Sequence, residues 1–66
     1  MKDNIFGKNL RQMRLNEHIS QNKLGEYLGV SNQLVSFWES GKREPDMDMI
    51  IKISEFFQCT IDELLK

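Results

Sequence analysis

Apolar residues recur along this chain at steps of three and four positions, the spacing that aligns side chains on one face of an α-helix. In the first segment, from Phe6 to about Glu17, the residues with this spacing are Phe6, Leu10 and Met13. In a later segment they are Met47, Ile50, Ile53 and Phe57, which we expect on the inner face of a helix. No segment has a convincing strand pattern. The sequence therefore predicts an all-α protein, a compact five-helix bundle.

Four helices are expected after the first, each beginning at a short polar side chain that can accept a backbone N–H. These predicted N-caps are Ser20, Ser31, Asp46 and Thr60. Glu63, three residues after Thr60, completes a capping box, which opens a short fifth helix. Glycine and proline within residues 41–45 predict a loop, because glycine readily ends a helix and proline cannot continue one.

The segment from about residue 20 to 41 contains two short helical patterns joined at Gly29, where a positive φ is expected. Such a break sets two helices roughly at a right angle. At about 100° per residue, one side of the second helix carries Leu34, Val35, Trp38 and Glu39. The other side carries Asn32, Gln33, Ser36 and Phe37. The first side can pack on a core, and the predicted core residues are Leu24, Leu28, Val30, Val35, Trp38 and Ile50.

The same segment resembles the Cro and phage-repressor type of helix-turn-helix transcriptional regulator. The matching residues are Ser20-Gln21, Leu24-Gly25, Leu28-Gly29-Val30-Ser31, Val35-Ser36, Trp38-Glu39-Ser40-Gly41-Lys42 and Pro45. The likeness extends from about Phe6 to Leu65, nearly the whole chain. It implies a lambda-repressor-like fold with the helix-turn-helix at the second and third helices. It also implies sequence-specific binding of double-stranded DNA, most simply as a repressor that binds a palindromic operator as a dimer.

The resemblance places the start of the third helix in the major groove, which makes four residues candidate base readers: Asn32, Gln33, Ser36 and Phe37. Asn and Gln can pair bidentately with adenine, and a phenyl ring can pack on a thymine methyl group. We therefore expect A·T pairs where these residues meet the target. For Asn32 and Gln33 the alternative is an ordinary solvated helix face, and for Phe37 it is a partly buried core or partner contact.

A second set of residues is expected to bind phosphate, which sets affinity and register without carrying sequence information. Gln21 matches a family position whose side chain and backbone N–H hold a phosphate at a helix N-terminus. Lys42 and Arg43 follow in the loop after the reading helix, and Lys23 and Arg11 are candidates of lower rank. For each of these cations the alternative is a charge that serves only solubility.

Three further positions take their interpretation from the family. Arg14 and Glu39 match an arginine and a glutamate that pair and hold the reading helix against the scaffold. Gly25 stands where the family usually has a small residue, most often alanine, so Gly25→Ala is expected to stabilise the domain through helix propensity. His18 stands where the family usually has glycine, and we interpret it as a surface turn residue, neither a metal ligand nor a catalytic group.

The charge is distributed unevenly along the chain. The net charge of the 66 residues is −1, but residues 1–43 carry seven Lys/Arg and four Asp/Glu, whereas residues 44–66 carry two and six. The resulting charges of +3 and −4 indicate which half faces a polyanion.

The single cysteine, Cys59, is interpreted as a small core residue in a reducing cytoplasm. No apolar run approaches the roughly 18 residues of a membrane span, and no signal peptide or metal spacing is present.

These features predict one domain over residues 1–66, cytoplasmic in a bacterium or phage-infected cell, that binds DNA without a cofactor, metal ion or small-molecule ligand. Dimerisation is expected near the last helix, where four apolar residues exceed what a short segment easily buries: Phe56, Ile61, Leu64 and Leu65. The alternative function is a protein-interaction module, antitoxin-like or phage-encoded, with secondary DNA binding. An enzyme is not expected, because the chain has no nucleophile–base pair and no phosphate-binding glycine loop.

Overall fold

The computed structural model describes residues 4–66, and all regular structure in this range is helical. The five helices are α1 (Ile5–Asn16), α2 (Gln21–Leu28), α3 (Asn32–Ser40), α4 (Met47–Phe57) and α5 (Ile61–Leu65). The predicted all-α, five-helix architecture is therefore confirmed. The first helix differs slightly from the prediction, since it begins at Ile5 and ends at Asn16, with Glu17 as its C-cap. Within residues 4–66 no helix has both the length and the apolar character that crossing a bilayer requires.

All four predicted N-caps make the expected hydrogen bond. The side chains of Ser20, Ser31, Asp46 and Thr60 accept from the backbone N–H three residues later, at 2.9–3.1 Å. In a second hydrogen bond, the carboxylate of Glu63 accepts from the backbone N–H of Thr60 at 2.9 Å, which completes the capping box. Each cap satisfies a helix N–H that has no partner within its own helix, so these short side chains determine where α2 to α5 begin.

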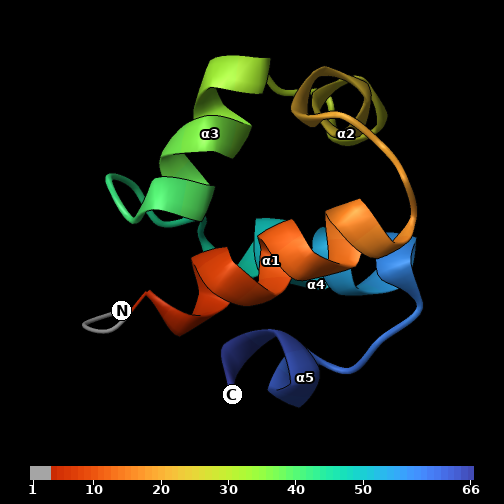
Figure 1. The fold of residues 1–66 in the computed structure, drawn as a ribbon. Helices are drawn as coiled ribbons and strands as arrows, with labels where there is room; N and C mark the ends of the chain where they lie inside the picture. The colour runs from red at the N-terminus through yellow and green to blue at the C-terminus, as the bar shows by residue number, and fades with distance from the viewer. Residues whose placement is uncertain (1–3) are drawn as a thin grey trace.

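The helices form three levels in the view of Figure 1. The helix-turn-helix pair α2 and α3 lies at the top, α1 and α4 cross the middle, and α5 closes the bottom. Helix α1 contacts α3 on one side and α5 on the other, while α2 and α3 contact each other. The result is a nearly isometric domain of 25 × 24 × 22 Å, in which α3 lies at the periphery.

Within residues 4–66 the core is built from nine apolar side chains contributed by all five helices: Phe6, Leu10, Leu24, Leu28, Val35, Trp38, Ile50, Ile53 and Leu64. Five of the six predicted core residues are among them, and Val30 is half-buried against their edge. Met47 was expected on the inner face of α4, but 55% of its surface is exposed. Met49 packs against the core instead, because Met47 is the first residue of α4, at its exposed end.

The burial of Leu64 corrects the predicted dimer surface. Leu64 is 0% exposed and belongs to the core, because α5 packs against α1 and α4. It is therefore unavailable to a partner. The other three residues of that predicted surface, Phe56, Ile61 and Leu65, are only half-buried.

Side chains from elsewhere in the fold cap the C-terminal ends of three helices. Asn4 Nδ2 donates to the carbonyl of Glu39 at the end of α3, at 2.9 Å. Asn9 Nδ2 donates to the carbonyl of Leu64 in α5, also at 2.9 Å. Lys52 Nζ donates to the carbonyl of Leu28 at the end of α2, at 2.8 Å. Each bond satisfies a carbonyl that lacks a partner within its helix, and each ties one helix to another.

Gly25 corrects a prediction about stability. A Cβ built on this residue would lie 2.6 Å from the carbonyl oxygen of Val30, closer than real Cβ atoms approach backbone. The cause is the tight return of the chain after α2, where the N–H of Val30 donates to the carbonyl of Gly25 at 2.9 Å. Alanine would thus gain helix propensity but force the turn to shift. The expectation that Gly25→Ala stabilises the domain is wrong on this geometry.

Two turn residues have the predicted conformation. Gly29 ends α2 with φ 78°, in the left-handed region that glycine tolerates without cost. His18 has φ 57° and an exposed side chain, as expected for a surface turn residue that takes the place of glycine. A non-glycine residue in this region carries a steric cost of roughly 1 kcal/mol.

Candidate nucleic-acid interface

Helix α3 has two chemically different sides. Its inner side buries Val35 and Trp38 at 0% and 3% exposure, and it directs the carboxylate of Glu39 inward. On its outer side Asn32 and Gln33 are exposed, whereas Ser36 and Phe37 are half-buried. The four predicted base readers therefore share a surface that the core does not cover. The amides of Asn32 and Gln33 make no hydrogen bond to any residue within 4–66, so both retain donors and acceptors for a ligand.

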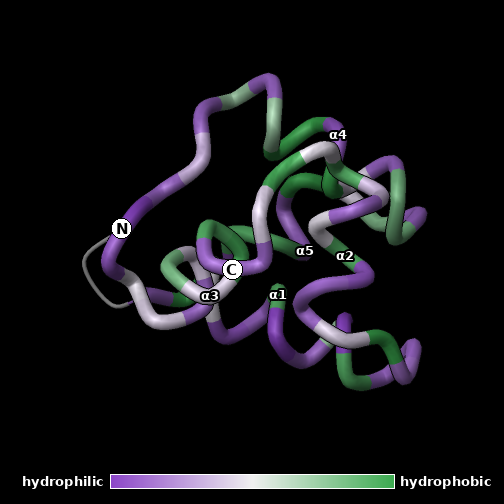
Figure 2. The backbone as a smooth tube through the Cα atoms, turned by 90° about the horizontal axis from the view of Figure 1, so that it is seen from above, coloured by the Kyte–Doolittle hydropathy of each residue, from purple (hydrophilic) through white to green (hydrophobic). Residues whose placement is uncertain are grey.

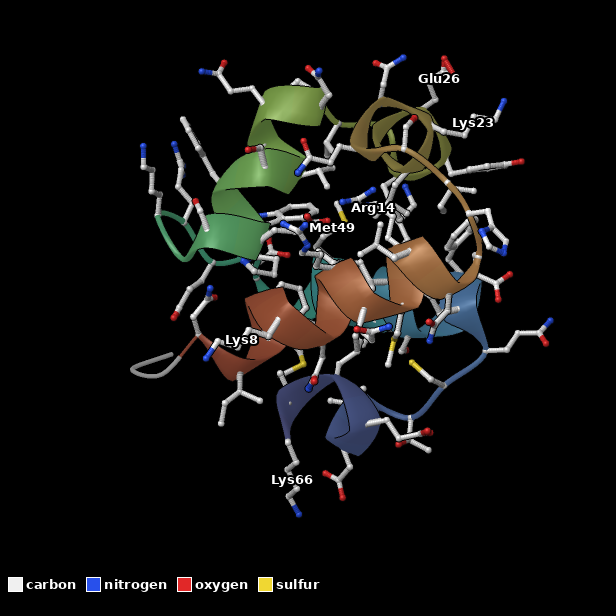
Figure 3. The ribbon with its side chains drawn as sticks, in the orientation of Figure 1. Lys8, Arg14, Lys23, Glu26, Met49 and Lys66 are labelled. Carbon is white, nitrogen blue, oxygen red and sulfur yellow. The ribbon has the colours of Figure 1, made fainter. Side chains whose placement is uncertain are left out.

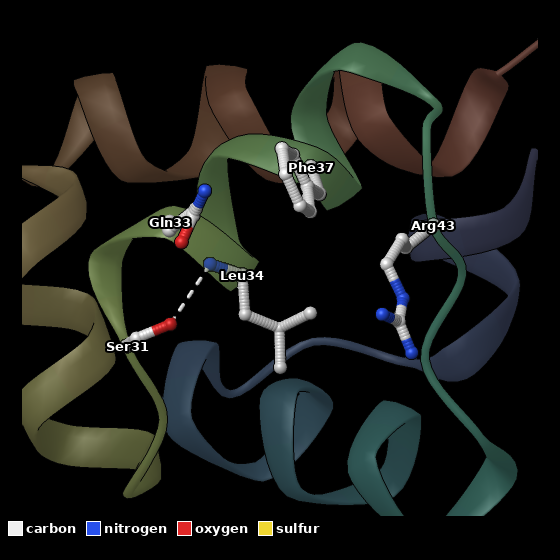
Figure 4. Close-up of a pocket in the computed structure, with 5 residues that line it drawn as sticks. All are labelled: Ser31, Gln33, Leu34, Phe37 and Arg43. Atoms are coloured by element: carbon white, nitrogen blue, oxygen red, sulfur yellow. Dashed lines mark hydrogen bonds between the residues drawn. The ribbon is translucent and has the colours of Figure 1, made fainter.

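A cleft of about 270 Å³ opens beside this surface. It is lined by Ser31, Gln33, Leu34, Phe37 and Arg43. In Figure 4 the side chains of Leu34, Phe37 and Arg43 surround an open space between α3 and the segment that follows it. Two predicted base readers and one predicted phosphate-binding residue thus border the same cleft.

The segment that follows α3 is held against the helix by its backbone. The N–H groups of Lys42 and Arg43 both donate to the carbonyl of Phe37, at 2.9 and 3.3 Å. The ammonium of Lys42 also lies 5.6 Å from the centre of the Phe37 ring, within the range of a cation–π contact. Figure 2 shows residues 41–46 as a mostly hydrophilic run along the outer edge of the molecule. The backbone of two cationic residues is therefore held beside the outer side of α3.

A buried ion pair connects α3 to α1. Arg14 Nε lies 2.7 Å from Glu39 Oε2, and Arg14 Nη2 lies 3.1 Å from Glu39 Oε1. The side chains are only 10% and 4% exposed. A third donor of Arg14, Nη1, binds the carbonyl of Ile19 at 2.9 Å in the turn between α1 and α2. Figure 3 shows Arg14 in the interior, whereas Lys8, Lys23 and Lys66 point outward.

Gln21 joins this pair and is therefore not a free surface amide. Its Nε2 donates to Glu39 Oε1 at 3.1 Å, and the residue is half-buried. One N–H of the amide is used in this bond, which leaves the second N–H and the backbone N–H at the start of α2 for an anion. The position expected to hold a phosphate is thus mechanically linked to the ion pair that orients α3.

The two lower-ranked cations lie apart from the cleft. Lys23 is on α2, 3.9 Å from the carboxylate of Glu26 and 5.6 Å from the ring centre of Tyr27. Its charge is therefore partly balanced by its own helix, and Figure 3 shows Lys23 and Glu26 projecting from α2 together. Arg11 is exposed on α1, outside the helix-turn-helix pair.

Sequence reasoning missed two residues that position α3. Asn4 has a left-handed backbone, with φ 52°, and its side chain caps α3 as described above. Gly7 lets α1 approach α3 closely, because a Cβ there would lie 2.4 Å from the carbonyl oxygen of Trp38. Neither has a signal in the local pattern, since both roles depend on contacts more than thirty residues away.

Cys59 is half-buried, with its Sγ 3.8 Å from the Sδ of Met13. Burial, and secondarily the negative charge of Glu63, raise the pKa of the Cys59 thiol. The thiol therefore stays protonated at neutral pH, as a core residue would. Among residues 4–66 no three His, Cys, Asp or Glu side chains cluster closely enough to hold a metal ion.

Comparison with known proteins gives a consistent result. The sequence model of the helix-turn-helix family matches residues 10–64. The chain is 47% identical over 60 residues to the HTH-type transcriptional activator BcrR of Enterococcus faecalis, which covers 91% of the chain and 29% of BcrR. It is 36% identical over 66 residues to the repressor protein C2 of Salmonella phage P22, which covers the whole chain and 31% of that repressor. The chain thus spans about a third of the length of these relatives.

The fold also matches solved structures. The crystal structure of the P22 c2 repressor protein in complex with the synthetic operator 9T superposes with a TM-score of 0.87 and 37% sequence identity, covering 94% of both chains. The solution structure of the DNA-binding domain of the same repressor gives a TM-score of 0.86. The fold seen in Figure 1 is therefore the fold of that DNA-binding domain.

Proposed function

The chain belongs to the helix-turn-helix family of the Cro and phage-repressor type, and from this premise we propose that residues 1–66 form a sequence-specific double-stranded DNA-binding domain of a transcriptional regulator, most simply a repressor. The observation that carries the proposal is the outer side of α3, where four short polar and aromatic side chains are free of the core. A related repressor has been solved with an operator. The domain would act in the cytoplasm, at the nucleoid, by binding and not by catalysis.

Base recognition is assigned to the outer side of α3. Asn32 and Gln33 offer unpaired amides that can bond bidentately to adenine, and Phe37 offers an apolar ring to a thymine methyl group. Ser36 lies one turn along the helix and can bond to a base or a phosphate. Each good bidentate pair discriminates against the wrong base by about 1–3 kcal/mol. The target is accordingly expected to be rich in A·T pairs where these residues meet it.

Phosphate binding is assigned to residues on both flanks of α3. The backbone N–H at the start of α2 and the second amide N–H of Gln21 lie on one flank, and Lys42 and Arg43 lie on the other. Lys23 and Arg11 rank lower, because Lys23 is paired with Glu26 and Arg11 lies outside the motif. Contacts of this type fix the register of α3 in the groove.

A homodimer is the expected binding unit, because one reading helix covers only a few base pairs. Two copies on a palindromic site would place their half-sites about one helical turn apart, roughly 34–36 Å. With Leu64 buried, the candidate contact residues near α5 are the half-buried Phe56, Ile61 and Leu65.

Selection from a random duplex library tests this function. The chain is expected to enrich a palindromic sequence with A·T pairs in each half-site, and its affinity should fall steeply with salt. A variant with Asn32→Ala and Gln33→Ala should lose the enrichment. The control is Gln12→Ala, which removes an exposed amide on α1 that donates to Asn16 of the same helix. Failure to enrich any sequence, together with co-purification of a protein partner, would favour the protein-interaction module instead.

A further inference from the structure

The cleft beside α3 has a composition that suits one particular group on DNA. Leu34 and Phe37 form apolar walls, while the Gln33 amide and the Arg43 guanidinium lie at its rim (Figure 4). Neither rim group has a hydrogen bond or ion pair to the side chains of residues 4–66. A ligand that fills this cleft must therefore place an apolar group between the walls and polar atoms at the rim.

In the major groove only one apolar group projects from a base edge, the methyl group on C5 of a pyrimidine. Beside it lies the substituent on C4, which can meet the Gln33 amide at the rim. A phosphate of the adjoining backbone carries the negative charge that the free guanidinium of Arg43 attracts. The cleft, at about 270 Å³, has room for the C5 methyl group together with the neighbouring edge of the ring.

We propose that this cleft recognises the C5 methyl group itself, so that it accepts 5-methylcytosine where it accepts thymine and binds poorly to either pyrimidine without the methyl group. The inference rests on the DNA-binding function proposed above and specifies one of its subsites. It makes target binding responsive to cytosine C5 methylation.

The Gln33 amide can pair with either thymine or 5-methylcytosine. Thymine presents an acceptor oxygen on C4, whereas 5-methylcytosine presents an amino donor. A glutamine amide has both a donor and an acceptor end, and rotation of its terminal torsion exchanges them. Because Gln33 is exposed and unpaired within residues 4–66, no internal contact opposes that rotation. The apolar walls are the same for both bases, so the methyl contact is retained.

The Lys42 contact helps to keep the cleft open. Its ammonium lies 5.6 Å from the centre of the Phe37 ring, and the backbone bonds of Lys42 and Arg43 to the Phe37 carbonyl hold the segment beside α3. The Phe37 ring and the backbone of Arg43 are thus held beside each other before DNA arrives. A preformed site loses less conformational entropy on binding than a mobile one.

The test uses the duplex obtained by selection from a random library. Each thymine is replaced in turn by deoxyuridine, which removes only the methyl group. At one thymine per half-site the affinity should fall about fourfold, the value of one buried methyl group. At the same position a 5-methylcytosine·guanine pair should bind about fourfold more tightly than a cytosine·guanine pair. Phe37→Ala should abolish both differences, whereas Tyr27→Ala, the loss of an exposed ring on α2, should preserve them.

Three results would overturn the inference: no position sensitive to deoxyuridine, a sensitive position at which 5-methylcytosine is no better than cytosine, or differences that survive Phe37→Ala. In each case the selected duplex is still bound, so the proposed DNA-binding function stands. If no duplex is enriched at all, that function fails and the subsite fails with it. A thermal unfolding curve of Phe37→Ala that matches the parent chain excludes misfolding as the cause of lost discrimination.

Discussion

Arg14 and Glu39, twenty-five positions apart, meet inside the domain as a bidentate ion pair with N–O distances of 2.7 and 3.1 Å. Glu39 lies in α3 two residues after Phe37, the last candidate base reader, and Arg14 lies near the end of α1. The pair therefore couples the angle of α3 to the scaffold. Gln21 adds a bond from the start of α2, so one buried carboxylate joins α1, α2 and α3.

The Arg14–Glu39 pair predicts strong coupling in a double-mutant cycle. Arg14→Met or Glu39→Met alone should reduce the free energy of unfolding by about 3 kcal/mol, because the remaining charge stays buried without its partner. The double variant should lose only about 1–2 kcal/mol, for the bonds to Ile19 and Gln21. Denaturant titration measures all four proteins. Additive losses would show that the two side chains do not act as a pair.

Gly25→Ala is predicted to destabilise the domain although alanine favours helices. The new Cβ would meet the carbonyl oxygen of Val30 at 2.6 Å, and forcing the turn to shift should cost about 1–3 kcal/mol. Asn22→Ala, at an exposed site on the same helix, is the control and should gain a few tenths of a kcal/mol from propensity. A higher melting temperature for Gly25→Ala than for the parent would contradict the close approach.

His18→Gly is predicted to stabilise the domain by up to about 1 kcal/mol, because it relieves the steric cost of a Cβ at φ 57°. His18→Ala keeps the Cβ and should give no such gain. Gln58, the C-cap of α4 with φ 54°, offers an independent check, since Gln58→Gly should change stability in the same direction. The idea fails if both glycine variants unfold at lower denaturant concentration than their alanine counterparts.

The raised pKa of the Cys59 thiol predicts that the stability of the domain depends on pH. Burial, with a smaller contribution from Glu63, raises the folded-state pKa of the thiol above its ordinary value of 9.0. The stability that the neutral thiol contributes is therefore fully present below about pH 9. It is lost as the pH rises through the folded-state pKa. Between pH 8 and 10 the parent should lose more stability than Cys59→Ala. Equal losses in the two proteins would show that the thiol ionises as readily when folded as when unfolded.

The helices were predictable because their signals are local. The caps at Ser20, Ser31, Asp46 and Thr60 act on N–H groups three residues away, within reach of pattern reasoning. The spacing of apolar residues likewise assigned Val35 and Trp38 correctly to the inner side of α3, whereas Leu34, expected there too, is half-buried and also lines the cleft. Local patterns were insufficient where burial depends on another helix. Leu64 and Met47 have similar apolar character, yet one is fully buried against α1 and the other is exposed.

The site was only partly predictable for the same reason. Residue type and position on α3 identified the outer side, but not the cleft that Arg43 forms with Leu34 and Phe37. The long-range bond of Asn4 to α3 and the bond of Gln21 to Glu39 have no sequence signature. Gly25 shows most clearly what a local sequence pattern does not predict. Its helix propensity is a local property, whereas the sign of Gly25→Ala depends on a carbonyl in the next turn.

The most direct test of the account compares Gln33→Ala and Arg43→Ala on the selected duplex and on single-base variants of it. If α3 reads bases while its following loop binds phosphate, Gln33→Ala should relax preference at one base position and leave the salt dependence unchanged. Arg43→Ala should weaken all duplexes alike and reduce the slope of log affinity against log salt by about one unit. The opposite pattern, with Arg43→Ala changing base preference and Gln33→Ala changing only the salt slope, would contradict the assignment of the outer side of α3 as the reading surface.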